Sequence, residues 1–285
     1  MGIFEANDGT VLAFHRMGAG RPLICVPGGP MQASAYLGDL GGLAMKWPLL
    51  ALDLRGTGDS AEPADPGTYR CDRQVDDLEA LRVHLGFDTL DLLAHSGGAT
   101  IAMLYAARYP RRVGRLALVT PTPRPVGIDV TNEDRRAVAV LRQGEPWFAE
   151  SFASLERIWA GSATDEDWVA ITPFVYGRWD ETARSHAERA ESLTNRAAAA
   201  VYYSDDAFDP AAVRAGLALL TAPVLILAGE YDIQLGPKHA AQYAAFFSSP
   251  LAPPAQVAVL PAAGHFPWLD DPASFVDQLI RWLHG

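Results

Sequence analysis

A serine lies where the sequence changes from an apolar run to a segment of helical character. Residues 89–94 are typical of a buried strand, so Ser96 falls on a sharp turn between a strand and a helix. Such a turn lifts the hydroxyl out of the sheet, and the N–H of Gly97 then faces an incoming carbonyl oxygen. The strand and helix backbones nearly touch there, which requires small residues at Ala94 and Gly98. The pattern predicts a nucleophilic serine, and the alternative is an ordinary Ser-Gly-Gly turn.

A serine hydroxyl attacks a carbonyl only when a base takes its proton and a third group holds that base. His265 follows the last predicted strand, where a loop can return to the same edge of the sheet as Ser96. We therefore predict His265 as the base. The other histidines are expected on an early strand (His15), on helices (His84, His284), on polar surfaces (His186, His239) and in a buried, hydrogen-bonded position (His95).

The third group is expected after a strand end between the serine and the histidine. Prolines follow the strand predicted at 115–120, and no carboxylate stands there. The strand predicted at 223–228 is followed by Glu230 and Asp232. Asp232 lies deeper in the loop and is preferred, with Glu230 second and Asp129 third. The resulting order of serine, aspartate and histidine along the chain is that of one hydrolase fold rather than of chymotrypsin or subtilisin.

Short apolar runs alternate with helical patterns along most of the chain, which indicates βαβ units and a parallel sheet. Strands are predicted at 9–16, 22–27, 48–54, 89–94, 115–120, 223–228 and 256–260, and helices at 72–86, 97–109, 237–247 and 272–284. The alternation stops after 121, and the sequence is helical to about 210. We therefore expect an α/β core formed by residues 1–121 and 211–285, with a helical cap inserted at 122–210.

Composition excludes several classes of function. The 285 residues carry a net charge of −11, which argues against nucleic-acid binding. No apolar run reaches the ~18 residues of a membrane span, and the first residues do not form a secretion signal, so a cytoplasmic protein is expected. Cys25 and Cys71 have no metal-type spacing and no phosphate-binding glycine loop is evident, so neither a metal nor a cofactor is expected.

Taken together, these motifs resemble the α/β-hydrolase superfamily and, within it, the proline iminopeptidase branch. The similar segments are residues 28–30 (the oxyanion loop), 53–60 (a turn taken as mainly structural), 229–232 (the acid loop) and 264–268 (the histidine loop). The resemblance covers the whole catalytic domain, whereas the cap is similar only in being helical and in its place of insertion. It implies an α/β-hydrolase fold with a mostly parallel sheet flanked by helices.

The resemblance also implies an oxyanion hole made by the backbone N–H groups of Gly29 and Gly97. Three departures from the branch are visible. Pro27 and Met31 replace the first histidine and the last glycine of the oxyanion loop. Gly97 stands where the branch has tryptophan, and Ile233 stands where some relatives have a glutamate that binds the substrate amine. These departures concern the aminopeptidase activity and not the hydrolase chemistry.

The expected function is cleavage of an ester or amide bond of a small molecule or short peptide through an acyl-enzyme, most like a proline iminopeptidase. Residues 129–209 contain 16 acidic residues and 8 arginines. These acids are either solvated helix faces or include a carboxylate that binds a substrate ammonium group. The candidates are Glu145, Glu150, Glu181, Glu188, Glu191, Asp205 and Asp206. The alternatives are a carboxylesterase or lactonase acting on a small neutral substrate, and a catalytically inactive binding protein of the same fold.

Overall fold

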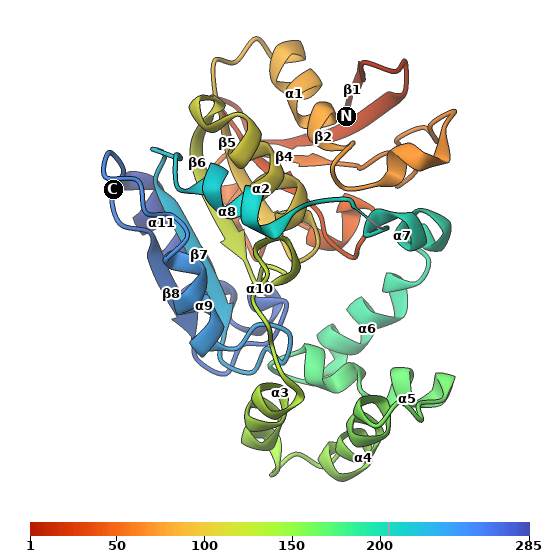
Figure 1. The fold of residues 1–285 in the computed structure, drawn as a ribbon. Helices are drawn as coiled ribbons and strands as arrows, with labels where there is room; N and C mark the ends of the chain where they lie inside the picture. Colours follow the sequence, from red (N-terminus) through yellow and green to blue (C-terminus); the bar gives the residue numbers. More distant parts are fainter. Residues whose placement is uncertain (205) are drawn as a thin grey trace.

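A mixed sheet forms the centre of the computed structural model, which describes residues 1–204 and 206–285 (Figure 1). Over these residues the sheet has eight strands in the order β1-β2-β4-β3-β5-β6-β7-β8. The strands are β1 (Gly2–Glu5), β2 (Val11–Met17), β3 (Leu23–Val26), β4 (Leu49–Leu52), β5 (Leu90–His95), β6 (Val113–Val119), β7 (Val224–Gly229) and β8 (Gln256–Leu260). β2 pairs antiparallel with β1 and β4, and all other pairs are parallel. The predicted mostly parallel sheet is therefore confirmed.

Helices cover both faces of this sheet. They are α1 (Val75–His84), α2 (Gly98–Arg108), α8 (Pro210–Leu217), α9 (Pro237–Ala244), α10 (Pro267–Asp270) and α11 (Pro272–His284). Ile24 and Val26 point into a core shared with α1, α2, α8 and α9, whereas Leu23 and Cys25 point into a second core shared with α11. This alternation explains why β3 is apolar throughout, since successive side chains of a strand face opposite sides.

The remaining helices lie between β6 and β7 in the sequence. They are α3 (Asn132–Ala139), α4 (Phe148–Trp159), α5 (Asp165–Ala170), α6 (Glu181–Ala190) and α7 (Arg196–Tyr202). α3, α4 and α5 extend away from the sheet (Figure 1). A small apolar core around Leu155 and Phe174 joins this part of the chain to Ile233, in the loop after β7. Thr131 begins α3 with a capping box, in which its hydroxyl and the Asp134 carboxylate each bond the other residue's N–H. We refer to residues 122–210 as the cap.

Three elements were not predicted from the sequence. One is α8 (Pro210–Leu217), which lies between the helical region predicted to about 210 and the strand predicted at 223–228. β1 (Gly2–Glu5) is a short edge strand, and only Phe4 of its four side chains is buried, so it carries no apolar run. α10 (Pro267–Asp270) is a single turn directly after His265. Within the described residues, no helix is both long and apolar enough to cross a membrane.

Candidate active site

Ser96 sits between the end of β5 and the start of α2, as the sequence predicted. Its φ of +50° lies in the left-handed region, which residues other than glycine rarely adopt. The turn is tight because α2 begins against the end of β3. A Cβ on Gly98 would lie 2.3 Å from the carbonyl oxygen of Pro27 and 2.6 Å from that of Val26. The small residue expected at Gly98 is therefore required by the close approach of two backbones.

Two loops bring His265 and Asp232 to this serine. His265 Nε2 lies 2.8 Å from Ser96 Oγ, and His265 Nδ1 lies 2.9 Å from Asp232 Oδ2. All three residues are buried, with Asp232 only 1% exposed. The loops are themselves held, since the His265 N–H donates to the carbonyl of Val175 and Asp232 Oδ1 accepts from the N–H of Gln234. When Nδ1 keeps its proton and donates it in a hydrogen bond to the Asp232 carboxylate, Nε2 is free to accept the serine proton.

The alternative acids do not take part in this arrangement. Glu230 Oε2 accepts a hydrogen bond from the N–H of Ala262, 2.7 Å away, and so closes the neighbouring turn. Asp129 is exposed at the start of the cap. The structure brings together Ser96, His265 and Asp232, the preferred choice at each position.

The two peptide groups expected to form the oxyanion hole face the serine from adjacent segments. A Cβ on Gly28 would lie 3.1 Å from the nitrogen of Gly97, so the loop touches the turn. The carbonyl of Gly28, which shares its peptide plane with the Gly29 N–H, accepts from Gln32 N at 3.1 Å. Among the described residues no acceptor is recorded for the N–H of Gly29 or of Gly97. Within the described residues, both N–H groups are therefore free to bind a substrate oxygen.

The loop that carries Gly29 contains a methionine in a left-handed conformation. Met31, which replaces a glycine, has φ +60°, and its side chain is fully buried. Its carbonyl accepts from the N–H of Asn195 in the cap, 3.0 Å away. A contact across more than 160 residues thus holds a methionine in a conformation that usually favours glycine.

A buried hydrogen-bond chain behind the site links this loop to the histidine. The N–H of Gly28 donates to the Tyr36 hydroxyl, which lies 2.7 Å from His95 Nδ1. His95 Nε2 in turn lies 2.9 Å from the carbonyl oxygen of His265, to which Thr120 Oγ1 also donates. Burial raises the pKa of the Tyr36 hydroxyl, and burial together with the nearby His265 lowers the pKa of His95 well below its usual value. Tyr36 therefore donates to a neutral His95.

The expected positions of two other histidines were wrong. His186 and His239 were assigned to polar surfaces, but they are only 5% and 3% exposed. His186 Nδ1 pairs with the Tyr176 hydroxyl and its Nε2 with the carbonyl of Tyr36. His186 is buried because the cap folds back over η1 (Ser34–Leu37). Its polar neighbours in the sequence gave no sign of this contact.

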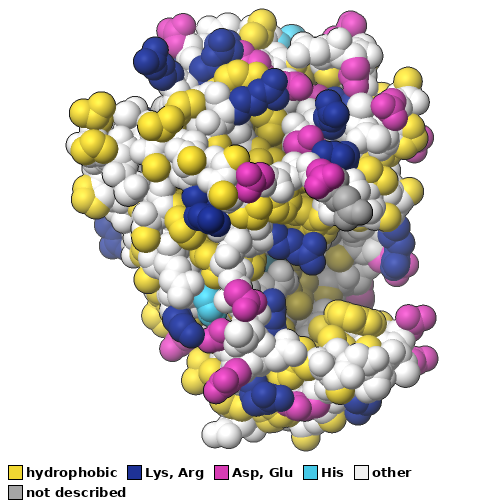
Figure 2. All heavy atoms as spheres, viewed as in Figure 1, with side chains coloured by type: hydrophobic (Ala, Val, Ile, Leu, Met, Phe, Trp, Pro, Cys, Tyr) yellow, Lys and Arg dark blue, Asp and Glu magenta, His cyan; other side chains and the backbone are white. Residues whose placement is uncertain are grey.

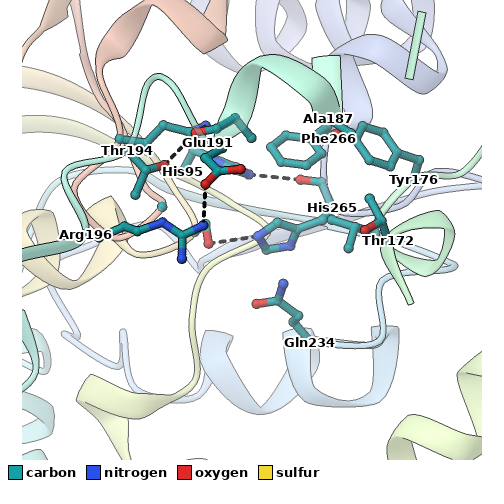
Figure 3. Close-up of a pocket in the computed structure, with 15 residues that line it drawn as sticks. His95, Thr172, Tyr176, Ala187, Glu191, Thr194, Arg196, Gln234, His265 and Phe266 are labelled. Carbon is teal, nitrogen blue, oxygen red and sulfur yellow. Dashed lines mark hydrogen bonds and ion pairs between the residues drawn. The ribbon is translucent and has the colours of Figure 1, made fainter. Parts of the chain in front are cut away.

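A cavity of about 480 Å³ opens above Ser96. Its lining is formed by Gly29, Gln32, His95, Ser96, Thr172, Val175, Tyr176, Ala187, Ala190, Glu191, Thr194, Arg196, Gln234, His265 and Phe266. Glu191, Thr194 and Arg196 gather on one side of it and Tyr176 and Phe266 on the other (Figure 3). The cavity therefore has a polar and an aromatic side.

Among the described residues, Glu191 is the one predicted cap acid that lines this cavity. Its carboxylate lies 2.9 Å from the guanidinium of Arg196, so its charge is already paired. Glu145 pairs with Arg142. Glu150, Glu181 and Asp206 are exposed, and Asp205 lies outside the described residues. Glu188 is also exposed and lines a neighbouring cavity in the cap. The prediction did not include Arg196, since a lone arginine at the start of a helix carries no signal in the sequence.

One group of possible metal ligands occurs in the described residues, formed by His15, Asp53 and Asp59. It lies on the turn at 53–60 that the sequence suggested is structural. Asp53 accepts hydrogen bonds from the N–H groups of Ser34 and Asp59 and pairs with His15. Its oxygens are occupied by protein donors, which fits a carboxylate that holds a turn.

Comparison with known proteins agrees with the fold. The sequence profile of the alpha/beta hydrolase fold matches residues 21–272. A proline iminopeptidase of Heyndrickxia coagulans is 33% identical over 122 residues, which is 42% of this chain and 42% of that protein. The match thus spans about two fifths of the curated relative.

Solved structures match over nearly the whole length. An esterase from Exiguobacterium antarcticum superposes with a TM-score of 0.73 at 18% identity, covering both chains completely. A thermophilic esterase from Thermogutta terrifontis superposes with a TM-score of 0.64 at 25% identity, over 99% of this chain and 97% of that one.

Proposed function

The chain belongs to the alpha/beta hydrolase fold family, and on that premise we propose that it is a serine hydrolase that cleaves an ester or amide bond through an acyl-enzyme. The observation that carries the proposal is the buried chain of hydrogen bonds from Asp232 through His265 to Ser96. A serine, a base and an acid at these distances form the arrangement that activates a hydroxyl.

In the proposed reaction, Ser96 Oγ attacks the substrate carbonyl while His265 Nε2 takes the hydroxyl proton. The N–H groups of Gly29 and Gly97 stabilise the negative oxygen that develops. His265 then gives its proton to the leaving group, and an ester on Ser96 remains. Water, activated by the same histidine, releases the acid. Asp232 keeps the imidazole in the required tautomer and stabilises its charge.

The cavity favours an ester over a peptide with a free amine. An aminopeptidase needs an unpaired carboxylate near the nucleophile, and Glu191 is already paired with Arg196. A substrate ammonium group would compete with that guanidinium, and because the two side chains are 77% and 76% exposed, the pair gives the ester an advantage of at most about 1 kcal/mol. Aminopeptidase activity stays the second candidate, supported by the similarity to a proline iminopeptidase and by the place of Glu191 in the cavity.

Labelling with a fluorophosphonate tests the serine directly. We expect the protein to be labelled and Ser96→Ala to lose the label, whereas Ser185→Ala, at an exposed serine on α6, keeps it. Labelling that survives in Ser96→Ala would reject the proposal. A folded wild-type protein that takes up no label would favour the inactive binding protein instead.

A second assay separates the two substrate classes. Proline and alanine arylamides are compared with their N-acetylated forms and with p-nitrophenyl esters of similar size. We expect the esters to be cleaved fastest and acetylation to have little effect. A strong preference for free amines that disappears in Glu191→Gln would instead establish the aminopeptidase.

A further inference from the structure

A second cavity, of about 420 Å³, adjoins the one above Ser96. The two cavities share Thr172, Ala187 and Glu191 in their linings. The rest of the second cavity is lined by Val169, Trp179, Arg184 and Glu188, all from the cap. On one face, the molecule is hollowed between the α4–α5 part of the cap and the body that carries the sheet (Figure 2). A molecule bound at the serine can therefore extend beyond the first cavity.

An aromatic surface runs between the two cavities. The ring centroids of Phe266 and Tyr176, which line the first cavity, lie 5.1 Å apart. Tyr176 lies 5.5 Å from Trp179, which lines the second. The Tyr176 ring is buried and its hydroxyl is bonded to His186, so the middle ring is fixed in place. This surface suits an apolar group better than a charged one.

Two apolar side chains at the outer cavity are incompletely buried. Val169 is 73% exposed, although it belongs to α5 in the cap. Trp179 is half-buried, and the guanidinium of Arg184 lies 5.8 Å from its ring centroid. Both side chains line the cavity. A site that removes this surface from water would account for both residues.

We propose that the outer cavity is a subsite for an apolar arm of the substrate, so that the natural substrate is an elongated ester with an alkyl or aryl arm. The inference rests on the proposed hydrolase activity. The arm belongs either to the acyl part or to the alcohol part of the ester, and both would be recognised by the same apolar surface.

Two series of substrates test the subsite and distinguish the two arms. In one, p-nitrophenyl esters range from acetate to decanoate. In the other, n-alkyl acetates range from methyl to octyl. We expect kcat/KM to rise in one series by up to about fourfold per methylene, the gain typical of burying a methylene, until the arm has filled the cavity. The series that rises identifies the arm.

Variants of the outer cavity should lower the ratio of long-chain to short-chain kcat/KM. Trp179→Ala removes the aromatic surface, and Val169→Asp places a charge at the rim of the cavity. The matched control is Trp168→Ala, because Trp168 is a 57% exposed tryptophan beside Val169 on α5 and does not line the cavity. We expect this control to keep both the ratio and the rate on acetate. If Trp179→Ala does not fold, Val169→Asp decides alone, since a residue so exposed tolerates the change.

The outcomes separate this inference from the proposed function. An active enzyme with a flat profile in both series would overturn the subsite and leave the hydrolase in place. An equal fall of the ratio in Trp168→Ala would also overturn it. A folded protein that hydrolyses no ester and no arylamide would instead contradict the hydrolase itself.

Discussion

Ser96 has a left-handed backbone conformation, which is unfavourable for serine. A left-handed φ costs a non-glycine residue of the order of 1 kcal/mol or more, and such strain persists only where the surroundings impose it. Here the Ser96 N–H donates to the carbonyl of Val119 and its carbonyl accepts from the N–H of Ala99, so both ends of the turn are fixed. The strain places Oγ in the cavity, next to His265.

Substitution of Ser96, His265 and Asp232 should show that these three residues act as one unit. We expect Ser96→Ala or His265→Ala to lower kcat by about four to six orders of magnitude, and Asp232→Asn by about four. The triple variant should be little worse than Ser96→Ala alone, because each residue serves the same step. Initial rates on a p-nitrophenyl ester measure this.

Glu230→Gln is the matched control for the acid. Glu230 is bonded to the neighbouring Ala262 N–H and not to the histidine, so its loss should leave kcat within about twofold of the wild type. If Glu230→Gln were inactive while Asp232→Asn stayed active, the assignment of the acid would be wrong.

The Tyr36 hydroxyl should affect the reaction rate indirectly, because it positions the Gly28 N–H and His95. Tyr36→Phe leaves the Gly28 N–H without its acceptor and His95 Nδ1 without its donor. A lost hydrogen bond of about 1 kcal/mol corresponds to a five- to tenfold lower kcat, with KM nearly unchanged. The affinity of a boronate transition-state analogue should fall by the same factor, since the oxyanion loop is what moves.

The control for this variant is Tyr105→Phe. Tyr105 is also fully buried, and its hydroxyl donates to Glu79 on α1, so the variant loses a similar bond with no link to the oxyanion loop. Equal effects of the two variants on boronate affinity would show that Tyr36 contributes only to stability.

At the scale of elements, the contact between β3 and α2 determines the shape of the turn that carries Ser96. Gly98→Ala should unfold the protein or destabilise it by several kcal/mol, because the new methyl would overlap the carbonyl oxygens of Pro27 and Val26. Gly144→Ala is the control, since a Cβ there meets nothing within 4 Å. Thermal unfolding measures both. A Gly98→Ala protein as stable as Gly144→Ala would show that α2 can move away from β3.

The cap does more than cover the cavity, because it also holds the acid loop. Arg142 is buried, and its guanidinium lies 4.9 Å from the ring centroid of Trp147 in the cap and 4.9 Å from that of Tyr231, beside Asp232. On the other flank of Asp232, Arg135 donates to the carbonyl of Ile233, 2.9 Å away. Two cap arginines thus brace the loop that carries the acid.

At the scale of the whole molecule, buried neutral histidines couple stability to pH. Burial lowers the pKa of both His95 and His186. In the unfolded chain each would titrate near pH 6.5, so the unfolded state takes up protons that the native state does not. The free energy of unfolding should therefore fall as the pH drops below about 6.5, by up to about 1.4 kcal/mol per pH unit for each histidine. Urea unfolding between pH 5 and 7.5 measures the slope.

Two variants isolate the histidine contribution. Burial raises the pKa of Asp77 to about 6, and this carboxyl opposes the histidines below that pH. His186→Gln leaves the Asp77 contribution in place, so the difference in slope from the wild type reports His186 alone and should correspond to at most one proton. His284→Gln, at an exposed residue, should leave the slope unchanged. Equal slopes in the wild type and His186→Gln would contradict the prediction.

The sequence by itself determined the order of the elements and the residues at the strand ends. Apolar runs and helical periodicity are local signals, and they predicted every parallel strand of the described sheet to within a few residues. The carboxyl ends of parallel strands meet at one edge, so Ser96, Asp232 and His265 could be proposed as neighbours although 169 positions separate the first from the last. The edge strand β1, with a single buried side chain, gave no such signal.

Only the tertiary structure decided which groups surround the substrate. Arg196 and Trp179 belong to segments whose local patterns say nothing of the serine, and they reach the cavities because the cap folds back over the oxyanion loop. Tyr36 lies behind the serine instead, where its hydroxyl contacts His95. The same folding buried His186 and paired Glu191 with Arg196, which no count of charges along the cap could show. Periodicity reports which face of an element is apolar. The partner that meets that face depends on contacts between distant segments, and those form only when the chain has folded.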